Sequence, residues 1–314
     1  MTSTPPASPC PCYMPINDPA SLCATADSLA RRTWDTILAG HAIGISVGEE
    51  SITDTNLIEL HTKHPEVRIK KFSKWEEGKS TGADWEWWFV FPGGDSLCIR
   101  VQAKIIKHLD SGPRFTNIDY PDDATRPRQL DMLIESCSRR NAADPRHVNK
   151  QRIPLYCFYL ASQTVPIPLA SEQTASMETC CVDAVSAAAK VWGCSLSHAE
   201  RVKEQLLTAK LHLSDIVACS VPWGCVLCTV FSARSEANPA RVALERLTEV
   251  LPGMPQLSAL DAIWRERPDY VHVVETDGEW EPGKKLAVPS VSHVAVVDLR
   301  EPPNQVNPFH QEPS

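Results

Sequence analysis

The sequence predicts a mixed α/β fold in which helices flank a central sheet. Three segments with strand-like composition, 67–74, 83–91 and 97–106, follow one another and predict an antiparallel meander. Residues 126–140 then show helical spacing, and 153–160 form a short apolar run typical of a buried strand. Two strands that are joined through a helix usually run parallel, whereas the strands of a meander run antiparallel. The sheet is therefore expected to be mixed.

Two helices are expected before the first strand. Residues 26–39 have helical spacing. In a helix, Leu29, Thr33, Ile37 and Leu38 would lie along one face. A second helix is predicted to begin at Ser51 or Thr53 and to end before Pro65, because proline cannot continue it. Acidic residues just before this start favour the positive end of a helix.

The chain divides into four predicted regions. Residues 1–24 form a disordered tail with six prolines in the first 19 positions, and 301–314 form a second tail with four prolines. Residues 25–165 contain the predicted core of the fold, and 166–300 a C-terminal α/β region that packs on it. In this second region the pattern predicts helices over 178–192, 197–211 and 239–250, a strand or strand pair over 215–230 broken at Pro222, and a final strand over 292–299.

Charge and hydropathy exclude several classes of protein. The 314 residues carry a formal net charge of −8, which argues against a protein that binds nucleic acid over its whole surface. Residues 61–160 are the exception, with 17 Lys and Arg against 13 Asp and Glu, so a local basic surface is expected there. No run is long and apolar enough for a membrane span, and the start lacks the features of a signal peptide, which predicts a cytoplasmic protein.

The twelve cysteines predict reduced thiols. Cys98, Cys137, Cys157 and Cys219 lie in apolar stretches, where a free cysteine behaves as a small core residue, so no disulfide framework is expected. A CxxC pair at 225 and 228 falls in the strand-like run 215–230, where residues three apart point to opposite faces. Zinc binding is therefore not expected.

A polar cluster is predicted on the hairpin that joins the second and third strands. Side chains alternate along a strand, so Asp84 and Glu86 share one face, while Trp85 and Trp87 point the other way, towards the core. A loop over residues 92–96 places Asp84 opposite Lys104 and Glu86 opposite Gln102. A shift of two residues keeps the four together, whereas a shift of one would bury the charges.

These residue types suit a divalent cation and a phosphate. Mg²⁺ prefers oxygen ligands and keeps several waters, so Asp84 and the amide oxygen of Gln102 are the expected ligands of Mg²⁺ or Mn²⁺. Lys104 beside the metal would stabilise the charge that develops on a phosphate. The cluster therefore predicts a metal-dependent phosphodiester hydrolase.

This arrangement resembles the PD-(D/E)xK nuclease superfamily. Asp84, then Gln102-x-Lys104 on the next strand, is similar to the Gln-containing form of Mrr-like restriction endonucleases, although Ala83 stands where the motif has proline. The resemblance covers residues 45–160 and implies a restriction-endonuclease-like core that cleaves DNA, in restriction or phage defence. It implies Glu50, or second to it Glu49, as the acid on the preceding helix. The sequence segments GADWEWW and VQAK also resemble those of an uncharacterised bacterial family with a domain of unknown function.

Other assignments remain open at this stage. Glu86, Gln129 and Arg100 are auxiliary candidates, and RNA remains an alternative substrate. The same core without activity would make a binding or scaffold protein. A third function, a serine hydrolase at Ser46, rests on a GxSxG match over residues 44–48, but that motif needs a strand before it and the preceding segment is predicted to be helical. The oligomeric state is open.

Overall fold

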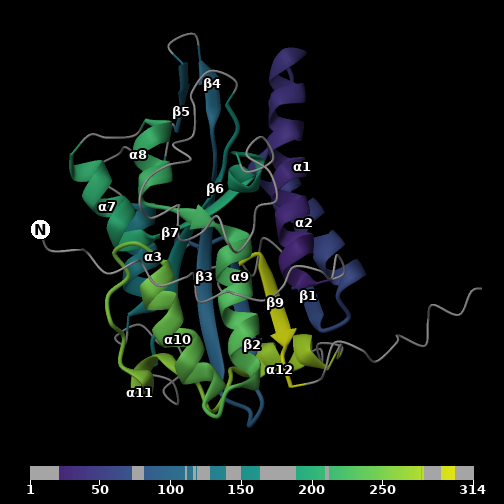
Figure 1. Cartoon of the computed structure of the whole chain (residues 1–314), viewed down its shortest axis with the longest axis vertical. Coiled ribbons are helices and arrows are strands. Elements are labelled where there is room, and N and C mark those ends of the chain that lie inside the picture. The colour runs from purple at the N-terminus through teal and green to yellow at the C-terminus, as the bar shows by residue number, and fades with distance from the viewer. Residues whose placement is uncertain are drawn as a thin grey trace, which may run out of the picture.

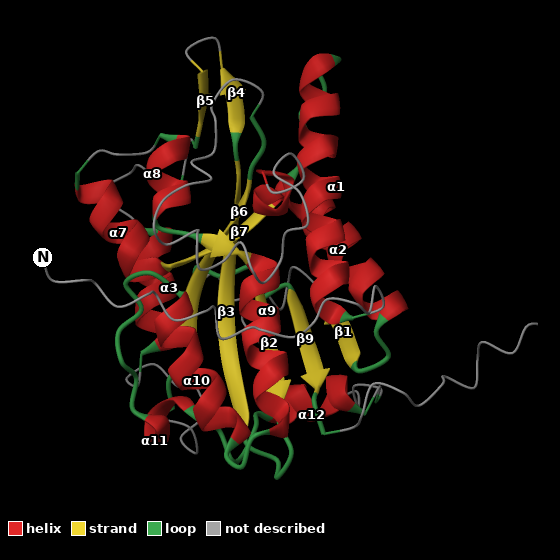
Figure 2. Ribbon diagram, in the orientation of Figure 1, coloured by secondary structure: helices red, strands yellow, loops and turns green. Residues whose placement is uncertain are grey.

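The computed structural model describes residues 21–72, 81–109, 112–115, 118, 128–138, 150–162, 189–208, 212–276, 278 and 291–300. Within these residues one seven-stranded mixed sheet lies between helices, and a small two-stranded sheet extends from one end of the molecule (Figures 1 and 2). The predicted α/β class is therefore confirmed. The two predicted tails lie outside the described residues, except for 21–24.

The large sheet brings together strands from the whole chain. Its parallel pairs are β2 with β9 and β3 with β6, and its other neighbours are antiparallel. In spatial order the strands are β1 (Val67–Lys71), β9 (His293–Asp298), β2 (Trp85–Val90), β3 (Ser96–Ile105), β6 (Ile153–Tyr159), β7 (Cys194–His198) and β8 (Val221–Pro222). The small sheet pairs β4 (Lys107–Leu109) with β5 (Gly112–Arg114).

Helices cover both faces of the sheet. In chain order the α-helices within the described residues are α1 (Leu22–Ala42), α2 (Glu49–Lys63), α3 (Gln129–Cys137), α7 (Ala199–Leu207), α8 (Leu213–Ala218), α9 (Trp223–Ser232), α10 (Pro239–Val250), α11 (Ala259–Ala262) and α12 (Asp269–Glu275). The 3₁₀ turns η3 (Ala189–Gly193) and η4 (Ala233–Ser235) join neighbouring elements. The predicted helix over 178–192 is described only from 189, where it is the 3₁₀ turn η3.

Alternation along β2 separates two apolar cores. Trp85 and Trp87 pack on the side of α1 and α9, where Trp87 meets Trp223 edge-on with ring centroids 6.3 Å apart. Trp88 points the other way, towards Trp264 and Tyr270 beside α12. The period-2 pattern of the strand therefore predicted correctly which tryptophans share a face.

The predicted three-strand meander is wrong at its first strand. β1 does not pair with β2, because β9 from the C-terminal end of the chain lies between them, antiparallel to β1 and parallel to β2. The physical reason is burial. β9 carries a continuous apolar run, Val294 to Val297, that is buried on both faces and therefore favours a position inside the sheet. In β1, Lys70 is half-exposed and Lys71 is exposed, which favours a position at the edge.

The strand pair predicted over 215–230 is also wrong. The segment forms α8, the two-residue strand β8 and α9, and Pro222 ends β8 and precedes the first turn of α9. Every residue of Trp223–Phe231 is buried, and a helix that is apolar on all sides has no period by which to recognise it. Of the other helices predicted in this half, 239–250 is confirmed as α10, and 197–211 contains α7.

The absence of disulfides was predicted wrongly for one pair of cysteines. Cys23 of α1 and Cys228 of α9 are joined by a disulfide, which links positions 205 residues apart in sequence. Because the CxxC segment is helical, Cys228 faces α1 instead of alternating along a strand. The remaining described cysteines are free and buried, as expected for small core residues: Cys98, Cys137, Cys157, Cys194, Cys219 and Cys225.

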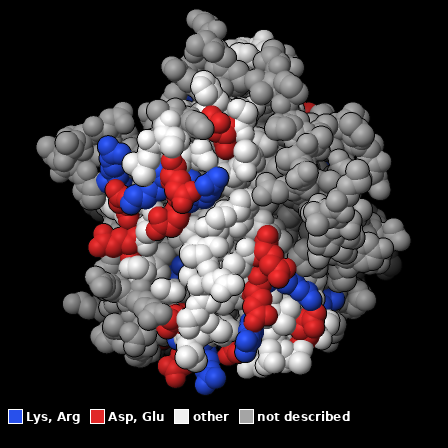
Figure 3. Space-filling view, turned by 60° about the vertical axis from the view of Figure 1, so that its left-hand side comes forward, with Lys and Arg blue, Asp and Glu red and all other residues white. Residues whose placement is uncertain are grey.

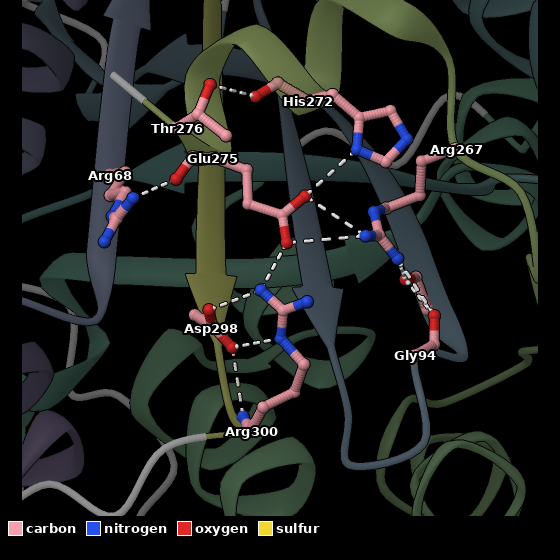
Figure 4. Close-up of polar contacts among 9 residues, drawn as sticks. Arg68, Gly94, Arg267, His272, Glu275, Thr276, Asp298 and Arg300 are labelled. Carbon is pink, nitrogen blue, oxygen red and sulfur yellow. Dashed lines mark hydrogen bonds and ion pairs between the residues drawn. The ribbon is translucent and has the colours of Figure 1, made fainter. Parts of the chain in front are cut away.

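A charged network holds α12 to the end of β9 and to the turn between β2 and β3 (Figure 4). The Glu275 carboxylate accepts from Arg267 and Arg300, and Arg267 also donates to the Gly94 carbonyl at 2.9 Å. Arg300 binds Asp298 as well, at 2.6 Å. These contacts fix the turn end of the hairpin. None of the described helices is both long and apolar enough to cross a bilayer.

Candidate functional site

The register of the β2–β3 hairpin decides which polar residues meet. Trp85 lies opposite Val101, so the pairing is shifted by two residues from the prediction, and Asp84 comes to Gln102 instead of Lys104. The loop is residues 91–95, closed by a hydrogen bond from Phe91 N to Asp95 O of 2.9 Å. Gly93 and Gly94 both adopt positive φ, which other residues rarely accept, and they make this earlier closure possible.

Just before β2 begins, the Asp84 side chain, and not a backbone carbonyl, accepts the hydrogen bond from the next N–H of β3. Its Oδ2 accepts from the backbone N–H of Ala103 at 2.7 Å and from Nε2 of Gln102 at 2.6 Å. The Asp84 side chain is half-buried at this position. A carboxylate is thereby fixed near the C-terminal end of β3, within one residue of Lys104.

Lys104 and Gln102 are connected through Gln129, the first residue of α3. Lys104 Nζ donates to Gln129 Oε1 at 2.8 Å, and Gln129 Nε2 donates to Gln102 Oε1 at 2.6 Å. Together with the bond to Asp84 this makes a continuous chain of side-chain hydrogen bonds from a cation to a carboxylate. Gln129 was only an auxiliary candidate in the sequence, and the structure brings it into direct contact with both strand residues.

Gly82 allows α3 to come this close. It has φ of +67°, and a Cβ at this position would collide with the Gln129 carbonyl and the Leu133 nitrogen. The adjoining Thr81 carbonyl accepts from Ser136 Oγ at 2.9 Å, which ties the same segment to the other end of α3. The backbone before β2 thus determines where the Gln129 side chain lies.

The first turn of α2 contributes Glu49. Its Oε1 accepts from the backbone N–H of Ile105 at 3.1 Å. Thr53, one turn further along α2, holds this turn in place. Its Oγ1 donates to the Glu49 carbonyl at 2.9 Å and lies 2.8 Å from the buried Tyr159 hydroxyl. Burial raises the pKa of Tyr159 well above its usual value, so this hydroxyl stays neutral and available for the bond. The helix begins at Glu49, two residues earlier than the first of the predicted starts.

Glu50, the first choice from sequence, lies elsewhere. It is exposed, whereas Glu49 is half-buried against β3. Glu50 interacts electrostatically with His293 on β9, on the side of the sheet that α2 covers. Neighbouring positions on a helix point about 100° apart, so only one of the two carboxylates can face the strand. We call the five residues that gather here, Glu49, Asp84, Gln102, Lys104 and Gln129, the β3-end cluster.

Glu86 and Arg100 do not belong to the β3-end cluster. Glu86 is fully buried, and its carboxylate accepts from Arg100 Nε at 2.6 Å, from the Tyr270 hydroxyl at 2.6 Å and from Trp88 Nε1 at 2.9 Å. Arg152 lies 3.2 Å from the same carboxylate and 4.7 Å above the ring of Trp264. We call Glu86, Arg100, Arg152 and Tyr270 the sealed cluster.

The sealed cluster corrects the prediction of one polar surface on the hairpin. Burial by itself would raise the pKa of the Glu86 carboxyl, yet Arg100, Arg152 and the Tyr270 hydroxyl together lower it to about 2. Arg100 also donates to the Ser136 carbonyl at 3.0 Å, so its guanidinium is held by protein groups. These two auxiliary candidates therefore have a structural role that links the hairpin to α3 and α12.

A second polar chain approaches Asp84 from β9, and the sequence did not indicate it. Ser292 Oγ donates to the Asp84 carbonyl at 2.6 Å and lies 2.9 Å from His293 Nδ1, while His293 Nε2 lies 2.9 Å from Asp54 of α2. Burial lowers the pKa of His293, and Asp54 opposes that shift. No local signal could have revealed this chain, because Ser292 and Asp84 are 208 residues apart.

The donor atoms at the β3-end cluster match a hard cation. The carboxylates of Asp84 and Glu49 and the side-chain amide of Gln102 supply oxygen donors, and Mg²⁺ is commonly held by one or two carboxylates and several waters. Gln102 now turns Nε2 towards Asp84 and its Oε1 accepts from Gln129, so the amide would have to rotate to offer its oxygen beside Asp84. In the part of the chain that the structure describes, no three His, Cys, Asp or Glu side chains converge into a site that would hold a metal by themselves. By donor chemistry alone, oxygen atoms without Cys or His suit Mg²⁺ or Mn²⁺ better than a structural zinc site.

Comparison with known proteins places this geometry in a family. The chain matches the model described as a family of unknown function, DUF6615, over residues 22–302. The chain belongs to the DUF6615 family. No curated protein and no solved structure matches it. The DUF6615 match begins at the first residue of α1 and extends past β9, so it includes every strand of the sheet and all residues of the β3-end cluster.

The other site predicted in this DUF6615 chain, Ser46, lacks the required setting. The loop that carries it follows α1 and precedes α2, so a helix stands where a nucleophile elbow needs a strand.

On the face shown in Figure 3, Lys and Arg side chains lie among Asp and Glu and form no continuous basic surface over the described residues. Any contact with a polyanion on this face would therefore be local.

Proposed function

We propose that this protein is a metal-dependent phosphodiester hydrolase that cleaves DNA. One observation carries the proposal: three consecutive residues of β3 bring together two carboxylates and an ammonium. Asp84 binds the N–H of Ala103, Glu49 binds the N–H of Ile105, and Lys104, the residue between these two in the sequence, donates from Nζ to Gln129 Oε1. Acidic groups from two different elements that flank a lysine are a donor set suited to a metal ion and a phosphate.

Each residue has a distinct proposed role. Asp84, Glu49 and the amide oxygen of Gln102 would hold Mg²⁺, which when bound supplies a water of lowered pKa and neutralises phosphate charge. Lys104 would donate a hydrogen bond to the phosphate or to the attacking water. Gln129 would orient the Lys104 ammonium, because its Oε1 already accepts from Nζ. Glu49 replaces Glu50 as the proposed helix acid because it is the one that contacts β3.

The choice of DNA rests on the similarity of the Asp84 and Gln102-x-Lys104 pattern to PD-(D/E)xK nucleases and on the local charge. Residues 61–160, which contain β2 and β3, carry 17 basic against 13 acidic residues in a chain of net charge −8, and two of the basic residues, Arg100 and Arg152, are buried against Glu86. A cytoplasmic nuclease of this kind would act in restriction or phage defence. RNA is the alternative substrate, and the experiment below includes it.

The experiment is cleavage of supercoiled and linear plasmid, and of a matched RNA, with Mg²⁺, with Mn²⁺ and with EDTA. We expect DNA cleavage that requires the metal and is lost in Asp84→Ala, Lys104→Ala and Glu49→Gln. Glu50→Gln is the matched control, because it removes the same charge one position away and should retain cleavage. Cleavage that persists in folded Asp84→Ala and Lys104→Ala would refute the assignment.

A thermal melt separates the enzyme from the alternative, a binding or scaffold protein on an inactive core. A bound metal stabilises the native state, so Mn²⁺ should raise the Tm of the wild type by several degrees and leave Asp84→Ala unchanged. Equal melts with and without Mn²⁺, together with no cleavage, would favour the scaffold. In that case the β3-end cluster would only join α2, α3 and the hairpin.

A further inference from the structure

The disulfide between Cys23 and Cys228 lies in the interface of α1 and α9. Cys23 and Asp27 are one turn apart on α1, and Gly224 and Cys228 are one turn apart on α9. Cys23 is bonded to Cys228, and a Cβ at Gly224 would collide with Oδ1 of Asp27. The two helices therefore run antiparallel here, and the Asp27 carboxyl lies one turn from the disulfide in the same interface.

The Asp27 carboxyl is buried and incompletely hydrogen-bonded. The residue is 8% exposed, and its Oδ1 has no hydrogen-bond partner within the described residues. Burial raises the pKa of this carboxyl from 3.8 to about 7, and Arg31, one turn further along α1, opposes the shift. A buried polar atom without a partner costs free energy, so its presence needs an explanation. Near neutral pH the carboxyl exists both with and without its proton, which suits a proton donor.

The two sulfur atoms of the disulfide have different surroundings. Cys23 is the second residue of α1, which begins after the N-cap Ser21, so it lies at the positive end of a long helix, which stabilises a thiolate. It is also the more exposed of the two, at 8% against 3% for Cys228. Cys228 lies in the interior of α9, where the surrounding helix is buried on all sides. A thiolate formed at Cys228 therefore needs a proton.

We propose that Cys23, Cys228 and Asp27 form a thiol–disulfide exchange site whose substrate is a small dithiol. One thiol of the dithiol loses its proton to water, and the resulting thiolate attacks Sγ of Cys23 to form a mixed disulfide. The bond between Cys23 and Cys228 breaks, and Cys228 leaves with the electron pair and takes the proton of Asp27. The site is independent of the proposed nuclease chemistry, because none of its residues belongs to the β3-end cluster.

The second step completes the transfer of two electrons. The other thiol of the dithiol attacks the dithiol sulfur of the mixed disulfide, and Cys23 is released and takes the proton of that thiol. The dithiol ends as a cyclic disulfide and both cysteines end as thiols. Asp27 regains its proton from water, so two electrons and two protons have passed from the dithiol to the cysteine pair.

Reduction frees the start of α1 from α9 without separating the helices. Trp223 Nε1 donates to the Ala26 carbonyl at 2.9 Å, and both residues belong to the main apolar core. The disulfide joins positions 205 residues apart, so it restricts the unfolded chain and stabilises the native state. The reduced protein is therefore expected to stay folded, with a Tm several degrees lower than that of the oxidised protein.

The experiment follows the reduction of the native protein by dithiothreitol near neutral pH. Samples are quenched with acid, free thiols are alkylated, and the labelled Cys23 and Cys228 are quantified by mass spectrometry. Asp27→Asn keeps the shape of the side chain but has no proton to give. We expect it to slow reduction about a hundredfold, the lower end of what a positioned proton donor contributes. Asp35→Asn, at an exposed position of α1, is the matched control and should react like the wild type.

Two cysteine variants test the assignment of the pair. Cys228→Ala should lower the Tm of the oxidised protein to near that of the reduced wild type. Cys225→Ala, one turn away on the same buried helix, should keep the disulfide and its rate of reduction. In urea the fold that holds Asp27 beside the disulfide is lost, so Asp27→Asn and the wild type should then be reduced at equal rates.

Three results would overturn the proposal. Equal rates of reduction of native Asp27→Asn and native wild type would remove the role of Asp27. A slower rate accompanied by a higher Tm of oxidised Asp27→Asn would do the same, because it would reflect less frequent opening of the interface. Complete alkylation of Cys23 and Cys228 in protein purified without reductant would refute the exchange site itself.

Discussion

The two polar clusters on the β2–β3 hairpin lie on the same face of the same strands and differ in what surrounds them. In the sealed cluster, the Glu86 carboxylate meets two guanidinium groups and is covered by Trp88, Trp264 and α12. In the β3-end cluster, Lys104 donates to the neutral amide of Gln129, and the carboxylates of Asp84 and Glu49 bind backbone N–H groups.

The polar residues farther from the open end of the hairpin are paired with one another and buried, and the proposed chemical role falls to those nearer that end. Glu86 is the second residue of β2, two positions after Asp84. At this position α12 and the apolar core around Trp88 and Trp264 cover it. Asp84 precedes β2 and is half-buried, so its carboxylate lies where β2 begins and the strand ladder ends. The predictions below test this separation.

The largest effect is expected in the sealed cluster. Glu86→Gln leaves the buried guanidinium groups of Arg100 and Arg152 without their counter-charge, and breaking a buried ion pair by removing one partner costs about 3–5 kcal/mol. Urea unfolding should show a loss of stability of this size. Glu245→Gln on the exposed surface of α10 is the control, and it should change stability by about 0.5 kcal/mol or less. Equal stabilities would mean that the sealed cluster is not structural.

Acid should weaken the sealed cluster in a defined pH window. The folded pKa of Glu86 is about 2, below its ordinary 4.5, so its ionised form is favoured in the native state. Its contribution to stability is complete above about pH 4.5 and is lost as the pH falls towards 2, an effect on the order of 3 kcal/mol. Urea unfolding at several pH values should show a smaller decline in Glu86→Gln than in the wild type, and parallel declines would contradict this.

Lys104→Met and Arg100→Met should have opposite consequences. If Lys104 contacts the phosphate, Lys104→Met lowers the rate of DNA cleavage by about a hundredfold, comparable to removing one preorganised donor, while Tm changes little. Arg100→Met should lower Tm and leave the cleavage rate of the folded protein nearly unchanged, because Arg100 binds Glu86 and the Ser136 carbonyl. A loss of cleavage in both folded variants would remove the distinction between the clusters.

A smaller effect is expected at Gly82, which sets the distance between α3 and β3. Gly82→Ala adds both backbone strain and a collision with the Gln129 carbonyl, whereas Gly93→Ala adds strain alone because nothing lies within 4 Å of the added Cβ. We expect Gly93→Ala to cost about 1 kcal/mol and Gly82→Ala about 2 kcal/mol. Gly82→Ala should also lower cleavage, through displacement of Gln129. Identical costs would show that α3 moves without consequence.

The sequence predicted the faces of the hairpin strands and missed their register. Alternation placed Asp84, Gln102 and Lys104 on one face and Trp85 and Trp87 on the other, because side-chain direction in a strand is a local property. The closure of the loop depends on Gly93 and Gly94 in left-handed conformations and on the pairing of Ser96 with Trp264, which is 168 positions along the chain. That pairing is long-range and could not be predicted locally.

The choice between Glu49 and Glu50 also needed the tertiary structure. Both lie in the first turn of α2, where either stabilises the helix dipole, so local physics does not separate them. The bond between Thr53 and Tyr159 fixes the rotation of the helix about its axis, and that rotation directs Glu49 to β3. Gln129 entered the site for the same reason, since Gly82 permits α3 to approach the strands.

The sequence by itself determined the α/β class, the helices α1, α2, α3, α7 and α10, the strands β2, β3, β6 and β9, and the identity of the polar residues near Lys104, because periodicity and residue chemistry are local. Tertiary structure decided that β9 separates β1 from β2, that Cys23 meets Cys228, and that one predicted polar face divides into two clusters. Glu86 is fully buried in the sealed cluster, whereas in the β3-end cluster Gln102 and Lys104 are buried and Asp84 and Glu49 are half-buried. These outcomes depend on which distant segments pack together. The burial of each segment against its partners, which no short stretch of sequence contains, sets that choice.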